Sequence, residues 1–600
     1  MIALFGHDEL STFGIAAILD VEKIPYRRVS SLDTQPGDVL LVAGGDLSAA
    51  EVASLDGQTA VVLNGGVAFA RAMMGATRAE VRNRSSALVL AQGIWPARVM
   101  QMAAGFGKVA LRIPLAPVCE ASTLRDATTL ATLSLEGATQ HSLAPAIARR
   151  DRCIWSAVDL GAAFATLVTE SYLPTAPVEG GSPSWLRLWA RRGAENAYYA
   201  APDLVRKWVQ RRSYAVLERR LRSYGEQVSE YPIDATGWLI IELLKRLIIH
   251  ASGALVRVER WPAPYEAAAT LTHDIEPRRY AYTKGLDRLL NYIAAVGHPA
   301  TVSLVAGAAD RYLPDSVVPR LRSHTLLCHG LEHRGENVNG REQVVASVRT
   351  ARAQLERRVH AAVDGYRSPR LDRSADLTWA LDQQQFRFDS SFPDVDRENI
   401  RHFGSGVRLN LPFRPPVRGP SGLLRPSRCL ELPLTAPDCI QPLYSDSSIA
   451  ELRATVENKA TFVRQTGGLY VALVHGGVFG DRDAKVREEH LGFVCRQLRQ
   501  PSVWFDGMER IVDWWCGREA LLLAERGTTL HLTNGGAQAM TGVRVVVERM
   551  DGQTVLLLPT LEAGASVLLA LPRGSVRTAA IEHVEETAVV FPQQVSRAIH

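Results

Sequence analysis

The chain has 600 residues, more than one hydrophobic core accommodates, and its length predicts roughly three or four domains. Its 46% hydrophobic and 22% charged residues are ordinary for a globular protein and argue against a disordered or membrane-embedded chain. The formal net charge of +5 lacks the concentrated basicity of most nucleic-acid-binding proteins, so we expect no nucleic-acid partner.

Residues 1–179 alternate short apolar runs with helical patterns, beginning with IALF, DVLLVAGG and TAVVLNGG. This rhythm is typical of β-α-β units around a parallel sheet, and it predicts an open α/β domain similar to the flavodoxin and glutamine-amidotransferase group. Asn64 stands where an amidotransferase would carry its nucleophile, and the sequence has no phosphate-binding glycine loop. We therefore expect this domain to be non-catalytic.

The first residues, MIALFGHDELSTFG, place acidic side chains where a secretory signal needs a basic region and a continuous apolar run. We expect no export signal and a cytoplasmic location, with membrane association as a variant. The most apolar stretch begins at Trp238 and is interrupted by Glu242, Lys245 and Arg246. These charges argue against a bilayer-spanning helix and predict a buried amphipathic one.

Residues 180–262 are expected to form a linker followed by a basic, aromatic helical segment. Prolines and glycines crowd the start of this range, and ten Arg or Lys residues alternate with Trp and Tyr between Trp185 and Arg222. Such a helix could lie on an anionic membrane surface, or it could cover a packed aromatic face with a solvated basic one. The sequence leaves both interpretations open.

Residues 263–518 again alternate strand-like and helical runs, and here reactive side chains follow one strand after another. A single strand-end histidine usually only bonds the backbone, but this region has several reactive strand ends: Asp274 and Glu276, His329 and His333, Arg367, Asp389, and His475. In a barrel of parallel strands such ends meet on one face. The pattern therefore predicts one site assembled from distant positions.

The spacing of four of these residues is typical of a metal site. His329 and His333 are four apart, so on one helical turn two imidazoles could hold one ion. Asp274 and Glu276 are two apart, so both carboxylates face the same side of an extended strand. A divalent cation near them would relieve their repulsion and keep the free acid ionised.

These residues resemble the NodB-homology domain of polysaccharide deacetylases, also called carbohydrate esterase family four. Five motifs of this domain have counterparts here in the same order. The motifs T-x-D-D, H-[ST]-x-x-H and R-x-P are similar to residues 272–276, 329–333 and 367–369. The fourth motif resembles residues 389–391, and the fifth, a strand ending in Leu-x-x-His or a similar sequence, resembles residues 473–475. The resemblance covers about 250 residues and implies a deformed (β/α) barrel that hydrolyses the acetamido group of a sugar.

The resemblance also implies catalytic roles. Asp274 would be the general base, His475 would protonate the departing amine, and Arg367 would hold Asp274 in place and ionised. Pro369 and Asp389 would contact the substrate.

The implied metal ligands are His329, His333 and Glu276, and Zn is the expected ion, with Co or Mn as alternatives. Ile275 occupies the place of the usual second aspartate, so Glu276 supplies the missing ligand on an acid-x-acid pattern. Gly330 replaces the usual serine or threonine without removing a ligand.

Residues 519–600 contain alternating strand patterns separated by Asn-Gly-Gly, Asp-Gly and Gly-Ala turns. They predict a small β-sandwich, which could bind glycan or only cap a domain.

The leading hypothesis is a metal-dependent carbohydrate deacetylase that removes the N-acetyl group of an amino sugar in a polysaccharide or in its cytosolic or lipid-linked precursor. O-deacetylation is a close variant. Two alternatives remain open: a metal-independent amidohydrolase acting on a small amide, and a non-catalytic glycan-binding scaffold in a polysaccharide assembly complex.

Overall fold

The computed structural model describes residues 1–35, 37–90, 99, 111–135, 144–169, 197, 205, 208–209, 212, 232–333, 337, 340–394, 407–436, 448–476, 484–526, 529–571 and 581–583. Contacts divide the chain into two compact units. The first unit contains Met1–Val168, Thr236–Glu266 and Asp513–His600, and the second contains Thr169–Ala235 and Ala267–Val512. Most of the basic, aromatic segment 185–222 lies outside the described residues, so its membrane interpretation stays a prediction.

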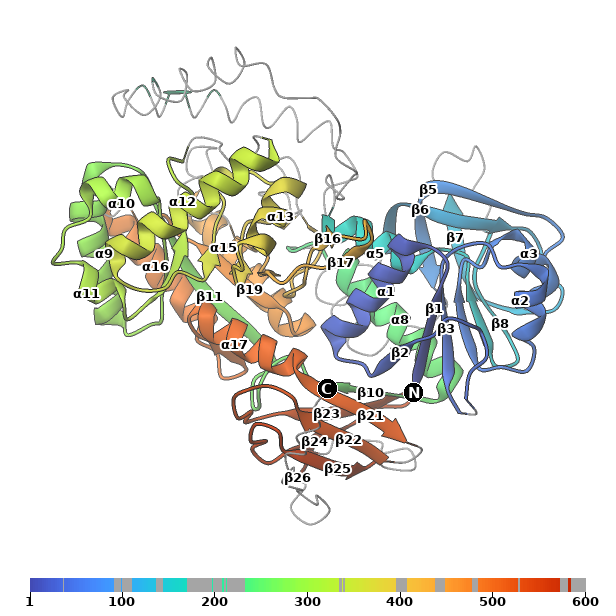
Figure 1. The fold of residues 1–600 in the computed structure, drawn as a ribbon. Coiled ribbons are helices and arrows are strands. Elements are labelled where there is room, and N and C mark those ends of the chain that lie inside the picture. Colours follow the sequence, from blue (N-terminus) through green and yellow to red (C-terminus); the bar gives the residue numbers. More distant parts are fainter. Residues whose placement is uncertain are drawn as a thin grey trace. The chain divides into compact units, whose positions relative to one another are not determined.

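The N-terminal part of the first unit is built on a nine-stranded sheet in the order β2-β1-β3-β4-β9-β8-β7-β5-β6 (Figure 1). Its parallel half comprises β2 (Tyr26–Arg28), β1 (Ile2–Gly6), β3 (Val39–Ala43), β4 (Ala60–Leu63) and β9 (Cys153–Ser156). Its antiparallel half comprises β8 (Ala144–Arg150), β7 (Thr128–Leu135), β5 (Ala79–Leu90) and β6 (Leu111–Ala121). Strands β3, β4 and β9 are buried along their whole length, as expected where both faces of a parallel sheet are covered.

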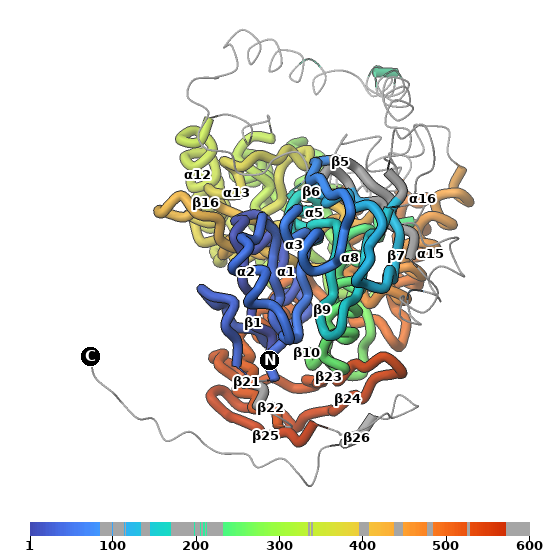
Figure 2. Tube along the Cα trace, turned by 90° about the vertical axis from the view of Figure 1, so that its right-hand side faces the viewer, coloured from blue at the N-terminus to red at the C-terminus, as the bar shows by residue number. Residues whose placement is uncertain are grey.

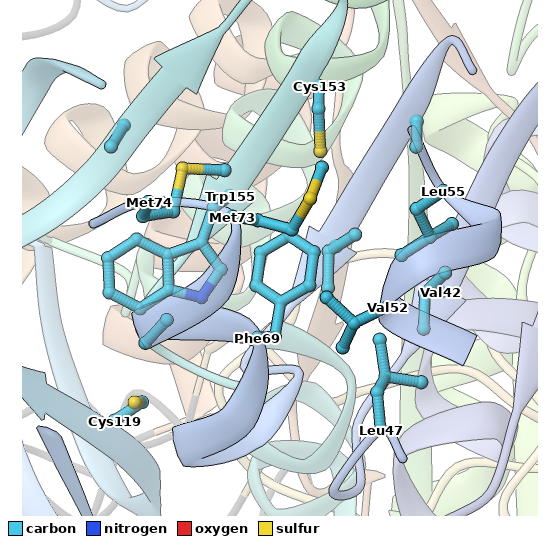
Figure 3. Close-up of a cluster of buried hydrophobic side chains, with 14 of the residues drawn as sticks. Val42, Leu47, Val52, Leu55, Phe69, Met73, Met74, Cys119, Cys153 and Trp155 are labelled. Carbon is cyan, nitrogen blue, oxygen red and sulfur yellow. The ribbon is translucent and has the colours of Figure 1, made fainter. Parts of the chain in front are cut away.

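A hydrophobic core fills one side of this sheet. Val52 from α2 (Ala49–Ser54) and Phe69 from α3 (Gly66–Ala72) belong to the same buried cluster as Val42 of β3 and Trp155 of β9 (Figure 3). Asn64 lies between β4 and α3 with φ 69°, in a sharp turn that its two following glycines continue. The position suspected of carrying a nucleophile therefore carries a left-handed turn, which asparagine tolerates well.

The apolar stretch that begins at Trp238 forms α8 (Thr236–Ser252), and its predicted burial is confirmed because residues 237–249 are all buried. The chain then enters β10 (Ala254–Val258), which pairs with β23 (Arg544–Arg549), a strand almost 300 positions later in the sequence (Figure 2). Two sheets form this part. The first has the order β10-β23-β24-β26, where β24 is Gln553–Leu557 and β26 is Ile581–His583. The second has the order β21-β22-β25, where β21 is Leu521–Arg526, β22 is Thr529–Asn534 and β25 is Ser566–Ala570. Residues that the sequence assigned to a linker thus supply a strand to the C-terminal β-structure.

A buried cluster of charges joins these distant segments of the first unit. The Lys245 Nζ of α8 lies 3.0 Å from Glu242, 3.3 Å from Glu548 of β23 and 3.6 Å from Glu22 of α1 (Glu9–Glu22). The Arg260 Nε donates to Glu22 at 2.8 Å. Glu22, Lys245 and Arg260 are each 3% exposed or less, so each buried charge depends on partners from another segment.

The second unit is organised around a parallel sheet in the order β18-β15-β14-β13-β12-β11-β19, with β20 also paired to β11. The strands are β11 (Ala267–Ile275), β12 (Thr301–Leu304), β13 (Thr325–Cys328), β14 (Gly365–Tyr366), β15 (Phe388–Asp389), β18 (Leu430–Glu431), β19 (Leu469–Leu473) and β20 (Val503–Phe505). A short antiparallel hairpin of β16 (Pro416–Arg418) and β17 (Leu424–Pro426) precedes β18.

The parallel sheet curls back on itself. After β18 the chain continues along β15, where Leu432 N donates to Asp389 O, and then reaches β19, where Leu473 N donates to Ala436 O. An isolated parallel bridge joins Ala436 to Ala472. This curled, parallel, mixed α/β architecture agrees with the predicted deformed barrel.

Helices alternate with these strands: α9 (Leu286–Val296), α10 (Ala306–Tyr312), α11 (Val318–Leu321), α12 (Arg341–Val359), α13 (Ala375–Gln383), α15 (Ile449–Thr466), α16 (Ala484–Leu498) and α17 (Met508–Glu519). In α12 the buried positions are Val344, Val348, Ala351, Leu355 and Val359, the single stripe that a helix over a sheet presents to the core. Among the helices that the structure describes, none is both long and apolar enough to cross a membrane.

Candidate active site

The central strand β11 delivers the two predicted carboxylates. All nine of its residues are buried, and Asp274 is its penultimate residue. Glu276 follows directly after the strand with a side chain that is 22% exposed, whereas that of Asp274 is 4% exposed. One carboxylate is thus enclosed by the barrel, and the other lies nearer to solvent.

Asp274 meets two of the predicted partners. Its Oδ2 lies 3.8 Å from Nε2 of His329, which follows β13, and 3.6 Å from Nη1 of Arg367, which follows β14. The side chains of His329 and Arg367 are 2% and 0% exposed. The carboxyl ends of three parallel strands therefore place an acid, an imidazole and a guanidinium together.

The orientation of His329 follows from a single hydrogen bond. Its Nδ1 lies 2.9 Å from the carbonyl oxygen of Arg367, and because a carbonyl can only accept, Nδ1 carries the hydrogen and donates it. In the neutral ring Nε2 then presents a lone pair on the side of Asp274. Burial lowers the pKa of His329 to about 4, so the ring is neutral near pH 7.

A second acid–imidazole pair is formed by Glu276 and His475, which follows β19: Nε2 lies 3.4 Å from Oε1. The ring of His333 lies 5.0 Å from that of His329 between centroids. The expectation that these two histidines share a helical turn is wrong. They lie in an irregular turn in which Gly330 has φ 71° and His333 has φ 58°, and this geometry favours glycine at position 330.

The electrostatic balance keeps both acids of the first motif ionised. Burial alone would raise the pKa of Asp274, but His329, which is protonated only in the acidic range where this carboxyl group titrates, and Arg367 outweigh burial and hold that pKa below its usual value. Burial also acts to raise the pKa of Glu276, but the electrostatic effect of His333 and His475 is larger, so the pKa of Glu276 is lowered as well.

The second terminal nitrogen of Arg367, Nη2, is hydrogen-bonded to two hydroxyl groups. Its Nη2 donates to Ser390 Oγ at 2.9 Å and to Thr272 Oγ1 at 3.4 Å. Because these acceptors lie on the strand ends β15 and β11, the guanidinium is fixed between them with Nη1 towards Asp274.

The two residues predicted to contact substrate are buried. Pro369 begins a one-turn helix (Pro369–Leu371), and Asp389 accepts from Ser390 N at 2.8 Å and from Ser391 Oγ at 2.5 Å. Burial raises the pKa of Asp389 to about 6. Their contact with substrate stays a prediction.

Glu431, at the end of β18, is a further buried acid near the site that was not predicted from the sequence. This carboxylate accepts from the backbone N of Ser391 at 3.1 Å and of Phe392 at 3.0 Å, and burial, together with the neighbouring Asp389, raises its pKa well above the usual value. Only two apolar residues, Cys429 and Leu430, stand between Arg428 and Glu431, so the strand-end signal at this position is weak.

The donor types at this site fit a divalent cation. Within the described residues Asp274 Oδ1 and Glu276 Oε2 are buried without a hydrogen-bond partner, and the His329 Nδ1 bond leaves Nε2 available as a ligand. In the part of the chain that is described, however, no group of three or more His, Cys, Asp or Glu side chains is already arranged to hold a metal.

The chain matches no protein-family model and no curated protein. Its structural neighbours include polysaccharide deacetylases. Agd3, described as a novel carbohydrate deacetylase, is 9% identical with a TM-score of 0.36, and the match covers 95% of this chain and 98% of Agd3. A probable polysaccharide deacetylase from Pseudomonas aeruginosa PAO1 and the Puue allantoinase are each 15% identical with a TM-score of 0.35, covering 43% of this chain and 93% of theirs.

Proposed function

We propose that this protein is a metal-dependent carbohydrate deacetylase that hydrolyses the N-acetyl group of an amino sugar, in a polysaccharide or in its cytosolic or lipid-linked precursor. The observation that carries the proposal is the position of Asp274, whose Oδ2 faces both His329 and Arg367 while its buried Oδ1 has no hydrogen-bond partner among the described residues. An ionised carboxylate with a free oxygen is suited to accept a proton from water.

In this proposal the two proton transfers are carried out by two different residues, Asp274 and His475. Asp274 takes a proton from the attacking water, and Arg367 keeps this carboxylate ionised and oriented. His475, which lies partly exposed beside Glu276, would give a proton to the departing amine nitrogen. With base and acid on separate strand ends, one group need not perform both transfers.

Glu276, His329 and His333 would hold the cation, Zn²⁺ with Co²⁺ or Mn²⁺ as alternatives. When bound, it supplies Lewis-acid polarisation of the acetyl carbonyl. The Arg367 carbonyl fixes the tautomer of His329, a support that histidine ligands commonly have. The carboxylate of Glu276, one of the proposed ligands, also lies 3.4 Å from Nε2 of His475, the proposed general acid.

The deciding experiment measures acetate released from N-acetylated amino-sugar oligomers, from lipid-linked precursors, and from matched O-acetylated sugars, with and without added zinc or cobalt. Metal-stimulated release from the N-acetylated sugars supports the proposal. Release only from the O-acetylated set makes the protein an esterase, and full activity on a small amide in excess chelator supports a metal-independent amidohydrolase. Glycan binding without any acetate release would favour the scaffold alternative.

A further inference from the structure

The guanidinium of Arg367 is fully buried and reaches Asp274 from a residue on another strand end. Such a long side chain can adopt many rotamers, so the distance between the guanidinium and Asp274 depends on the hydrogen bonds that the guanidinium makes to other residues. Two hydroxyl groups accept such hydrogen bonds, those of Ser390 and Thr272.

The hydrogen-bond directions at these hydroxyls are fixed. Ser390 Oγ donates its hydrogen to the carbonyl oxygen of Leu432 at 2.7 Å, and Thr272 Oγ1 donates to that of Ala472 at 2.9 Å. Because each hydroxyl has only one hydrogen, each presents a lone pair to Arg367. Both hydroxyls therefore only accept from Arg367, and Ser390 is the closer, at 2.9 Å against 3.4 Å.

Ser390 is itself rigidly placed. Its backbone N donates to Tyr366 O at 3.1 Å, on the strand that leads into Arg367. On its C-terminal side, Ser391 Oγ accepts from Ser368 N at 2.8 Å and donates to Asp389. The loop that carries Ser390 is thus bonded to the β14 segment by these contacts and to the segment after β18 through the carbonyl of Leu432, and the hydroxyl has little freedom to follow a displaced arginine.

We propose that Ser390 is a positioning residue that acts through Arg367 on the carboxylate of Asp274. This inference deepens the proposed function and rests on it for its kinetic effect. Ser390 lies 0% exposed behind the guanidinium, so the role involves no contact with substrate. Without the Ser390 acceptor, Arg367 keeps only the longer bond to Thr272 and can rotate away from Asp274.

The kinetic test uses Ser390→Ala and, as a matched control, Ser427→Ala. Ser427 is also a buried serine of the second unit, 1% exposed, and its hydroxyl bonds Asp382 and Cys429 N rather than any site residue. A hydrogen bond to a charged group supports an expected loss of kcat of about tenfold or more for Ser390→Ala, with KM changed less than about twofold. Ser427→Ala is expected to keep the wild-type kcat.

A double-mutant cycle separates positioning from general stability. If Ser390 acts through Arg367, then Ser390→Ala is expected to cost little further kcat in an Arg367→Lys background, since lysine lacks the planar fork that Ser390 holds. The same fold-loss in both backgrounds would overturn the proposal.

Crystal structures of the Ser390→Ala and Ser427→Ala proteins give a readout that needs no activity. The expected result is a guanidinium that has moved away from Asp274 in the first variant only, and an unmoved Arg367 would overturn the inference. If the wild-type protein releases no acetate from any substrate, the proposed function fails, while this structural comparison still decides the role of Ser390.

Discussion

Arg367 and His329 are linked by a hydrogen bond of 2.9 Å from the imidazole Nδ1 to the backbone carbonyl, while the side chain of the same arginine lies 3.6 Å from Asp274. One residue therefore sets the tautomer of a proposed metal ligand with its backbone and the ionisation of the proposed base with its side chain. A substitution of Arg367 therefore changes the group that faces the base and keeps the carbonyl that faces the ligand.

Replacing the base tests the assigned chemistry most directly. Asp274→Asn keeps the size of the side chain but removes proton acceptance, and we expect acetate release to fall about 10²- to 10⁴-fold. Asp376→Asn is the control, because Asp376 forms a partly exposed ion pair with Arg341 at 2.8 Å in the same unit. Thermal denaturation of both variants checks folding. Unchanged acetate release from a folded Asp274→Asn protein would refute the base assignment.

Metal binding is tested on the two histidines. We expect purified protein to bind about one equivalent of zinc, and His329→Gln and His333→Gln each to weaken zinc binding at least about tenfold, because each removes a nitrogen ligand. The control is His360→Asn, an exposed residue that ends α12 with φ 51°, which asparagine accepts. Zinc content is measured by elemental analysis after dialysis, and activity is measured with chelator. Equal zinc content in all four proteins would rule out these ligands.

The buried Asp389 predicts a specific dependence of stability on pH. Burial raises its pKa from 3.8 to about 6, so between these values the folded protein binds this proton more tightly than the unfolded chain does. Its contribution to folding therefore weakens as the pH rises from about 4 to about 6. The Asp389→Asn protein has no carboxyl group to titrate at this position. We therefore expect its free energy of unfolding to increase, relative to that of the wild type, as the pH rises across that range. Urea denaturation at several pH values measures the difference, and a constant difference would contradict the prediction.

In the first unit, Glu22→Gln is expected to be strongly destabilising. Burial acts to raise the pKa of Glu22, but Arg260 and Lys245 outweigh it and keep the carboxylate ionised. Removing this charge takes from Arg260 its hydrogen-bonded carboxylate and from Lys245 one of its three carboxylate neighbours, and breaking such a buried pair typically costs about 3–5 kcal/mol. Glu80→Gln removes a comparable partner from Arg82 in a pair that is more than half exposed, and no measurable change is expected. Denaturant unfolding of the two variants checks the contrast, and equal stabilities would refute the importance of the buried cluster.

Much of the site could be predicted because strand ends are local signals. The strand pattern of β11 leads to Asp274, and apolar runs directly precede His329 and His475. The turn that carries His329 and His333 was less predictable, since a spacing of four fits a helix as well as an irregular loop. Only the left-handed φ values of Gly330 and His333 distinguish the two.

Other contacts could not be predicted from residues that are neighbours in the sequence. The pairing of β10 with β23 joins residues near position 256 to residues near 547, and the sequence around β10 reads as the end of a linker. Glu431 was overlooked because its partners are backbone groups of another strand, and backbone donors have no signature in side-chain patterns. The charged residues within α8 indicated burial without a membrane, but not which segments would neutralise them.

The sequence by itself determined which side chains end each strand, because periodicity and the residue types at strand ends depend only on neighbours along the chain. Tertiary structure alone decided that Arg367 faces Asp274, that Ser390 holds Arg367, and that Glu22 meets Lys245. Those relationships depend on strand register and on the curl of the sheet, which are set by packing between residues far apart in the chain.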